Sequence, residues 1–399
     1  MKLAQIFALL LCASCALSLQ NQKTVINSSS KVEAQSARAS SQTTSNQSIA
    51  IIPFESSDNL AYLQVRVNGS APLRFVLDTG AGVWVIDRAL AKTLNLKTEE
   101  QGKIAGAGAG SVDVTYTKNV SFGLTGIEPS VPSVALIDLS SLETSLGQKI
   151  DGIIGYDFFD RYVVEIDYDA NIVRLFEPKT YNYSGNGEAV PLKIKKKHAY
   201  VTAKIKLAGR EPVAREYLVD SGSSDAVNDE LISQSSAPKV EVVGGVGLGQ
   251  EFKVILSRLE RLQLGSYVFE NTNGASGGQK IGGELLHRFN VIFDYSHQQM
   301  ILEPNRHFQD GFVFDMLGAE LRLEQESKGF RVSAIYKNSP ASEAGLKEND
   351  LIKTVEGQPA LSFSLEQVRR MFAQGNEYLL GVRRRSETIR VKVRLRKLL

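Results

Sequence analysis

The sequence has almost no cysteine and little histidine. Its two cysteines, Cys12 and Cys15, lie within the first fifteen of 399 residues, which excludes disulfides and thiol chemistry from the rest of the chain. The four histidines are never at the spacing of metal ligands. Basic and acidic residues nearly balance at 46 and 44, so there is no electrostatic reason to expect a nucleic-acid partner. We therefore predict no metal, no cofactor and no nucleic acid.

Long apolar runs are absent after the N-terminus. Residues 3–19 are nearly all apolar and follow Met1 and Lys2, and no later run reaches the roughly 18 residues of a membrane-spanning helix. A short positive start, an apolar core and small residues near its end indicate an export signal at 1–18. The predicted location is therefore the periplasm or the cell envelope.

Three outcomes stay open for this start. Cleavage after Ser18 leaves a chain without cysteine. Lipid attachment at Cys15 is the second route, because Ala13-Ser14-Cys15 resembles a bacterial lipoprotein box, although Cys12 replaces the aliphatic residue of that pattern. An uncleaved helical anchor is the third.

A polar tether and a repeated β unit follow. Residues 19–49 are mostly Ser, Thr, Asn and Gln, which bury too little apolar surface to fold. Beyond them, an apolar strand runs into Asp78-Thr79-Gly80, and another runs into Asp220-Ser221-Gly222. Each copy continues with a glycine-rich turn and later with a segment of the form Asp-Tyr before Glu-Pro, in the same order. Short alternating apolar runs predict mostly β lobes, with one helix over 87–96.

Two carboxylates at matching places of a repeat suggest acid–base chemistry. A pseudo-two-fold arrangement of the lobes would bring Asp78 and Asp220 face to face. Two carboxyls a few ångströms apart share one proton, so one can activate a water while the other donates to a carbonyl. A single Asp-Thr/Ser-Gly is only a turn, so the signal lies in the duplication.

These residues resemble the retropepsin-like aspartic proteases. The likeness rests on Leu77–Ala81, on 220–223, and on Ile153-Ile154-Gly155 behind the first Asp loop; its counterpart 280–282 departs from the pattern by carrying Lys280. The resemblance implies a single-chain pseudo-dimer of two β lobes with Asp78 and Asp220 as the catalytic pair. It implies supporting roles in the catalytic loops for Thr79, Gly80, Ser221, Gly222 and Ser223, with the Thr79 and Ser221 hydroxyls bracing the two loops together. It also implies flaps over an extended peptide, with substrate-binding residues Gly106, Ala107, Gly108, Gly245, Val246 and Gly247. For these glycine-rich turns a plain hairpin tip is the alternative.

The last part of the chain resembles a PDZ domain of bacterial exported proteases. Asn338–Ala341, Ala344–Leu346 and Asp350–Ile352 carry the likeness. The predicted elements are an amphipathic helix over 365–372 and a strand over 389–395. PDZ domains bind a chain end as an added strand, and we predict that Gly329, Phe330, Arg331 and Val332 do so here. The alternative is a domain that only docks on its own protease lobes.

The complete prediction is an exported aspartic endopeptidase of mostly β fold, in which an α+β PDZ domain follows two lobes. Its substrate is a peptide or unfolded protein, with a chain end as a PDZ ligand. The alternative is a catalytically silent peptide-binding scaffold. A last hypothesis is that the Ser223 hydroxyl donates to Asp220, so that the shared proton lies on Asp78. The predicted ranges are an export signal at 1–18, a disordered tether at 19–49, lobe 1 at 50–180, lobe 2 at 186–306 and the PDZ domain at 311–399.

Overall fold

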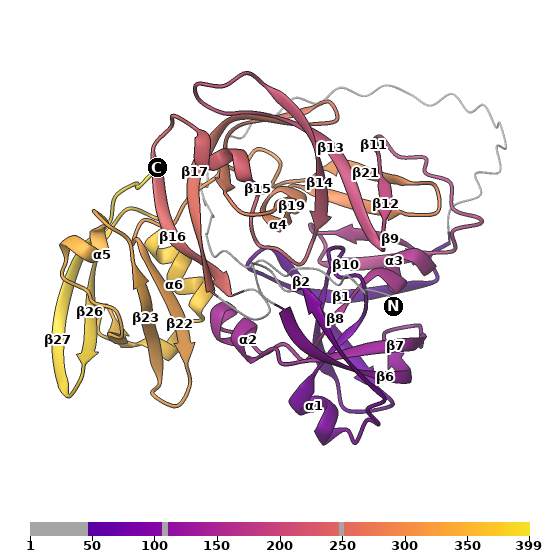
Figure 1. The fold of residues 1–399 in the computed structure, drawn as a ribbon, viewed down its shortest axis with the longest axis horizontal. Helices are drawn as coiled ribbons and strands as arrows, with labels where there is room; N and C mark the ends of the chain where they lie inside the picture. Colours follow the sequence, from indigo (N-terminus) through magenta and orange to yellow (C-terminus); the bar gives the residue numbers. More distant parts are fainter. Residues whose placement is uncertain (1–46, 106–110, 247–250) are drawn as a thin grey trace, which may run out of the picture.

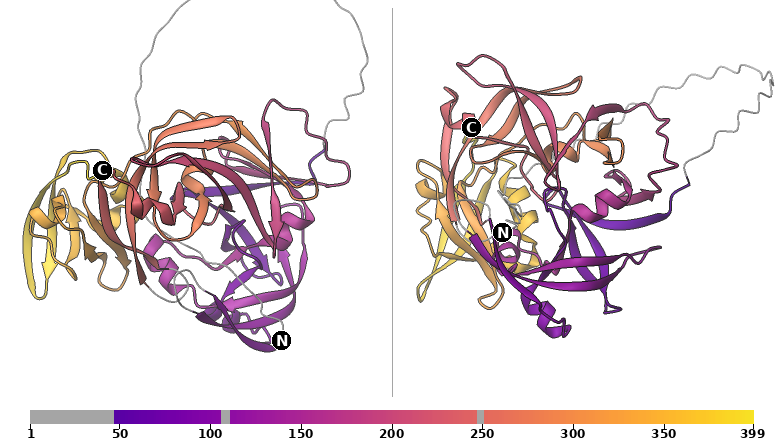
Figure 2. Two further views of the ribbon diagram at one scale, coloured as in Figure 1. Left: turned by 45° about the horizontal axis from the view of Figure 1, so that its top comes forward. Right: turned by 45° about the vertical axis from the view of Figure 1, so that its right-hand side comes forward.

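The computed structural model describes residues 47–105, 111–246 and 251–399. The predicted export signal, Cys15 and nearly all of the tether lie outside these residues. The described chain is built mainly of β strands, and a third, smaller β unit lies to one side of two larger ones (Figures 1 and 2). Among the described helices, none has the length and apolarity needed to cross a bilayer.

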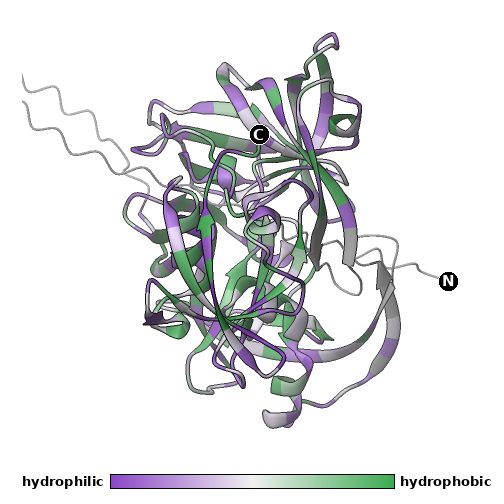
Figure 3. Cartoon of the chain, turned by 90° about the vertical axis from the view of Figure 1, so that its left-hand side faces the viewer, coloured by the Kyte–Doolittle hydropathy of each residue, from purple (hydrophilic) through white to green (hydrophobic). Residues whose placement is uncertain are grey.

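The first lobe surrounds the first Asp loop. Buried and exposed residues alternate along its first strand, where Ala50, Ile52 and Phe54 are buried and Ile51 and Pro53 are exposed. Figure 3 shows hydrophobic and hydrophilic residues following one another along the strands of the molecule. Its elements are β1 (Ala50–Ser57), β2 (Leu60–Val67), β3 (Leu73–Leu77), β4 (Val85–Asp87), α1 (Arg88–Thr93), β5 (Glu100–Ala105), β6 (Ser111–Gly123), β7 (Ser130–Ile137), α2 (Ser140–Leu146), β8 (Gly152–Ile154), α3 (Tyr156–Arg161), β9 (Val163–Asp167) and β10 (Ile172–Phe176).

The second lobe repeats this order of strands around the second Asp loop. Its elements are β11 (Glu188–Pro191), β12 (Lys193–Lys195), β13 (His198–Lys206), β14 (Val213–Asp220), β15 (Val227–Asp229), the 3-10 helix η1 (Glu230–Gln234), β16 (Lys239–Val246), β17 (Glu251–Leu264), β18 (Tyr267–Ala275), β19 (Gln279–Gly282), α4 (Gly283–Leu286), β20 (Phe289–Asp294) and β21 (Gln299–Pro304).

One continuous sheet joins the two lobes. Strand β9 pairs antiparallel with β20, and Ile166 lies opposite Val291 in this register. The resulting sheet runs β11-β21-β20-β9-β10-β1 before it continues into the first lobe. The largest apolar core accordingly contains buried residues of both lobes. The two lobes therefore share a core and a fixed orientation, which positions their Asp loops relative to each other.

The C-terminal unit is a separate sheet of order β22-β23-β24-β26-β27 with its own apolar core. Its elements are β22 (Ala319–Glu324), β23 (Gly329–Ile335), α5 (Pro340–Glu343), β24 (Leu351–Val355), β25 (Gln358–Pro359), the 3-10 helix η2 (Ala360–Ser362), α6 (Leu365–Phe372), β26 (Glu377–Arg384) and β27 (Glu387–Arg394).

The expected helices are present. Helix α1 lies inside the predicted range 87–96, and the Asp87 carboxylate caps it by accepting from the Leu90 N–H at 2.9 Å. Helix α6 has the predicted bounds because Ser364 and Gln367 form a reciprocal capping box at its start. The short helices α2, α3 and α4 were not predicted, since each is at most two turns long and carries little periodicity.

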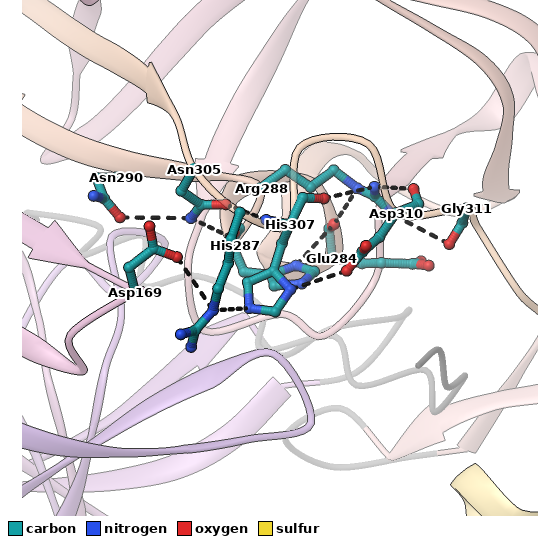
Figure 4. Close-up of polar contacts among 10 residues, drawn as sticks. Asp169, Glu284, His287, Arg288, Asn290, Asn305, His307, Asp310 and Gly311 are labelled. Carbon is teal, nitrogen blue, oxygen red and sulfur yellow. Dashed lines mark hydrogen bonds and ion pairs between the residues drawn. The ribbon is translucent and has the colours of Figure 1, made fainter. Parts of the chain in front are cut away.

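A clamp of polar groups fixes the segment between the second lobe and the C-terminal unit (Figure 4). The buried Arg288 guanidinium donates to the carbonyl oxygens of His307, Asp310 and Gly311. The same guanidinium lies 3.8 Å above the ring of Phe312. Because one cation binds three successive parts of this segment, the C-terminal unit is held at a defined place beside the lobes.

A second contact joins the C-terminal unit to the first lobe through Arg369 of α6. Its Nη1 lies 3.2 Å from Oδ2 of Asp58, in the turn between β1 and β2. Its Nη2 donates to the Ser145 carbonyl of α2 at 2.9 Å and to the Leu321 carbonyl of β22 at 3.3 Å. Arg369 is only 5% exposed, and burial raises the pKa of Asp58 to about 6 in spite of this cation. Arg369 thus joins the C-terminal unit to the first lobe through contacts that are buried from solvent.

Replacing Arg369 by Ala should destabilise the protein by about 3 kcal/mol, because the partly buried Asp58 carboxylate would lose its partner. The measurement is urea unfolding at neutral pH. Arg370→Ala is the matched control: Arg370 pairs with Glu366 on the same helix at a more exposed site, which is worth about 0.5 kcal/mol or less. If both variants lose the same free energy of unfolding, the Arg369 contact stabilises the protein no more than the exposed Arg370 pair does.

Candidate active site

The two Asp loops have the same construction. Strand β3 leads into Asp78 and runs parallel to β8, and β14 leads into Asp220 and runs parallel to β19. The Asp78 N–H donates to the Ile154 carbonyl at 3.0 Å, which holds the first loop against the strand behind it. Both Asp side chains lie where an apolar strand ends, and both residues are 1% exposed.

The structure brings the two carboxyls to the opposite loops. A Cβ atom built on Gly222 would lie 2.3 Å from Cγ of Asp78, and one built on Gly80 would lie 2.7 Å from Oδ1 of Asp220. Such distances leave no room for a side chain at either glycine. The glycines therefore permit the close approach that the face-to-face pairing of Asp78 and Asp220 requires.

Reciprocal hydrogen bonds brace the loops together. The Thr79 hydroxyl accepts from the Ser221 N–H at 2.9 Å and donates to the Val219 carbonyl at 2.7 Å. The Ser221 hydroxyl accepts from the Thr79 N–H at 3.0 Å and donates to the Leu77 carbonyl at 2.9 Å. This is the cross-brace that the family resemblance implies. It fixes the separation of the two carboxyls with two buried hydroxyl groups, each of which both donates and accepts a hydrogen bond.

The two carboxyls differ in their electrostatic surroundings. Burial raises the pKa of Asp78 well above its usual range, and the neighbouring Asp220 carboxyl raises it further. The Gly80 N–H, which donates to Oδ1 of Asp78 at 2.7 Å, opposes that rise. At Asp220, by contrast, the ammonium group of Lys280 lies 3.1 Å from Oδ2. When the pair holds a single proton, these surroundings favour its binding to Asp78.

The hypothesis that Ser223 donates to Asp220 is wrong. The hydrogen bond of the Ser223 hydroxyl among the described residues is with the Asp225 N–H, at 3.4 Å. Lys280, and not Ser223, occupies the position next to Oδ2 of Asp220. Ser223 is fully buried, and its hydroxyl accepts from the N–H of Asp225, two residues further along the chain, instead of donating to Asp220.

Sequence reasoning overlooked two further groups beside the dyad. His198 of β13 is buried, and its ring would lie 3.2 Å from a Cβ on Gly82, just after the first Asp loop. Burial lowers the pKa of His198 to about 4, so its ring is neutral at physiological pH. Asp225 follows the second loop, and burial raises its pKa to about 6. Neither residue belongs to a motif, so only the fold identifies them.

The structure describes only two of the six predicted flap residues, together with the strands that flank both flap segments. Strands β5 and β6 pair antiparallel, as do β16 and β17. Gly245 and Val246 end β16, where a bulge shifts the register between Gly244 and Val246. Gly106, Ala107, Gly108 and Gly247 lie outside the described residues.

The predicted peptide-binding strand at Gly329–Val332 is wrong. Gly329, Phe330, Arg331 and Val332 begin β23, which is an interior strand between β22 and β24. Its backbone donors and acceptors are therefore already paired on both sides, and Phe330 and Val332 are fully buried. The strand order places β22 and β27 at the two edges of this sheet, and Arg369 of α6 already donates to the Leu321 carbonyl of β22.

Comparison with known proteins agrees with this architecture. Residues 63–158 match a family model described as Aspartyl protease, and residues 331–384 match a PDZ domain model. No curated protein matches the chain. The first match spans the Asp78 loop and the strand behind it, and the second spans β24 and α6. In these two stretches the chain is thus similar to an aspartyl protease domain and, nearer its C-terminus, to a PDZ domain.

Proposed function

We propose that this protein is an aspartic endopeptidase that hydrolyses peptides or unfolded proteins with a water activated by Asp78 and Asp220. One observation carries the proposal: two buried carboxyls face each other across loops whose glycines, Gly80 and Gly222, have no room for a side chain. A structural role alone does not account for two desolvated carboxyls in contact, because such an arrangement is costly unless a proton is shared.

The reaction needs one acid and one base in contact with the same peptide bond. The ionised carboxyl removes a proton from a water molecule, which attacks the scissile carbonyl carbon, while the protonated carboxyl donates to the carbonyl oxygen. As the tetrahedral intermediate collapses, the carboxyl that took the proton of the water passes it to the leaving amine, and the other carboxyl takes back a proton from the hydroxyl of the intermediate. The brace between Thr79 and Ser221 supports this sequence because it holds both carboxyls at a fixed separation.

The proposed substrate is an extended chain. The hairpins β5–β6 and β16–β17 belong to different lobes, and we propose that they close over a substrate strand from both sides. Extended peptides offer backbone donors and acceptors that such hairpins can pair with. A folded protein would not present this shape.

For the PDZ domain, the contacts favour docking on its own protease lobe. Arg369 binds Asp58 and the Ser145 carbonyl of the first lobe while it also binds Leu321 of the edge strand β22. A peptide that added to β22 would have to displace these contacts. We propose that docking is the resting arrangement, and that chain-end capture by this PDZ domain occurs only when the Arg369 contacts are released.

The test of the enzyme proposal is cleavage of an unfolded protein by the wild type and by the Asp78→Asn protein. Turnover by the wild type that is lost in a folded Asp78→Asn variant is expected. The competing proposal is a catalytically silent peptide-binding scaffold, and it predicts that both proteins bind the unfolded substrate equally and cleave nothing.

We also propose that the chain is exported, on the strength of the apolar N-terminal segment. Mass spectrometry of the mature N-terminus from cells should find either a start directly after Ser18 or a lipid-modified Cys15. If the mature protein still begins with Met1, neither cleavage has occurred, and the N-terminal segment is an uncleaved anchor.

A further inference from the structure

A buried lysine contacts the Asp220 carboxyl of the dyad. Lys280 lies on β19 and is 2% exposed, and its Nζ lies 3.1 Å from Oδ2 of Asp220. Burying an ammonium group is costly unless a charged or hydrogen-bonding partner offsets the lost hydration. A negative charge on Asp220 therefore stabilises the buried ammonium group of Lys280, and the ammonium group stabilises that charge in return.

In the first lobe an apolar residue, Ile153, takes the place of this lysine. Strand β8 places Ile153 opposite Val76, two residues before Asp78, and β19 places Lys280 opposite Leu218, two residues before Asp220. Ile153 and Lys280 thus occupy the same position in the two lobes. Because Ile153 is fully buried and apolar, the two loops differ in charge at this position, and they differ again where the first loop has Val83 and the second has Asp225.

Other ionisable groups surround the pair from every packed element. Asp225 lies on the loop after β14, and its charge also interacts with Lys280. His198 of β13 is neutral through burial, and burial keeps Tyr295 in its protonated form. The ionisable groups that act on the dyad, directly or through Asp225, are Lys280, Asp225, Glu284 and Glu320, and burial raises the pKa of Glu284 to about 8. Lys280 is the cation in direct contact with a dyad oxygen among the described residues.

We propose that Lys280 is a positioning residue that holds the negative charge of the dyad on Asp220 and so leaves the shared proton on Asp78. The two carboxyls then have fixed roles: Asp220 is the base toward the water, and Asp78 is the acid toward the carbonyl oxygen. The catalytic consequence rests on the proposed function, whereas the location of the proton does not.

The location of the proton can be measured without any substrate. Wild-type protein labelled with carbon-13 at its aspartate carboxyls is titrated by NMR, and the two dyad signals are assigned with the Asp78→Asn and Asp220→Asn proteins. Glutamate carboxyls, including the buried Glu284, stay invisible under this labelling. The Asp220 carbon should keep the chemical shift of a carboxylate, and the Asp78 carbon that of a carboxylic acid, across the range in which one proton is bound. Equal intermediate shifts of the two carbons would overturn the proposal.

The second experiment measures the pH dependence of turnover in Lys280→Met, which keeps an unbranched side chain one atom shorter and removes its charge. A cation beside the dyad favours loss of both its protons, so without it both limbs of the pH–rate profile should move to higher pH. The expected displacement is about one to three pH units, larger for the acid limb, because the first proton is lost from the carboxyl that Lys280 touches. Lys204→Met is the matched control: it removes one positive charge from an exposed site in the same lobe, where solvent screens it, and its limbs should stay in place.

The outcomes separate this inference from the proposed function. A wild type that cleaves substrate while Lys280→Met shows unmoved limbs overturns the role of Lys280 and leaves the enzyme intact. If the wild type cleaves no substrate but its two carboxyl carbons show the unequal chemical shifts, the enzyme proposal is overturned. The assignment of the proton to Asp78 then still holds. If Lys280→Met does not fold, the titration of the wild type still decides where the proton lies.

Discussion

The Asp78→Asn and Asp220→Asn proteins should each lose activity by several orders of magnitude, while the double variant should be scarcely less active than either single one. The reason is that hydrolysis needs one acid and one base at once, so removing either carboxyl already removes the whole reaction. Residues that act as a unit are strongly non-additive. The measurement is kcat/KM on one unfolded substrate for all four proteins of the cycle.

Two results would contradict this expectation. Losses that add in the double variant would mean that the carboxyls act independently, although the structure places them against each other's loops. Activity that survives in Asp220→Asn would mean that the first lobe works with a second copy of itself. Circular dichroism of each variant is the control for folding, because a buried Asn in place of an Asp changes hydrogen bonding.

Gly222→Ala should lower kcat/KM by about 100-fold or more. The new methyl group would lie 2.3 Å from Cγ of Asp78, so the Asp78 carboxyl must move away from its partner. A displacement of this size breaks the alignment of acid, water and base. The backbone of Gly222 is not in the left-handed region, so Ala adds no conformational strain of its own.

Gly311→Ala is the matched control for this variant. A Cβ on Gly311 meets nothing within 4 Å, and the residue lies in the segment before the PDZ domain, away from the dyad. Its activity should equal that of the wild type, and its stability should change by less than about 0.5 kcal/mol. Equal activity of Gly222→Ala and Gly311→Ala would show that the dyad tolerates a shift of Asp78.

Local patterns in the sequence predicted much of the fold. The Asp loops could be found because each lies at the end of an apolar strand and carries Thr or Ser and then Gly. Helix α6 was predicted with its exact bounds, since its apolar spacing and the cap at Ser364 are both local signals. The brace between Thr79 and Ser221 followed from the family resemblance.

The rest depends on contacts between distant segments. Lys280 was visible as a departure from the pattern, but its contact with Asp220 follows from the parallel register of β14 and β19. The peptide-binding strand was misplaced because alternation does not distinguish an interior strand from an edge strand, and the order of the PDZ sheet puts β22 at the edge. The contact of Arg369 with Asp58 joins opposite ends of the described chain, and no local signal marks it.

The sheet shared by the lobes has a consequence for the order in which the chain can fold. A first lobe that folds ahead of the second has all of its own strands, yet the outer edge of β9 stays unpaired until β20 of the second lobe is in place. An unpaired strand edge is a template for another chain, so this intermediate is prone to pair with a neighbouring molecule. The late pairing also makes folding slow, because the contact between Ile166 and Val291 closes a long loop. We therefore expect aggregation of this protein to compete with folding most strongly after its first lobe has formed and before its second has.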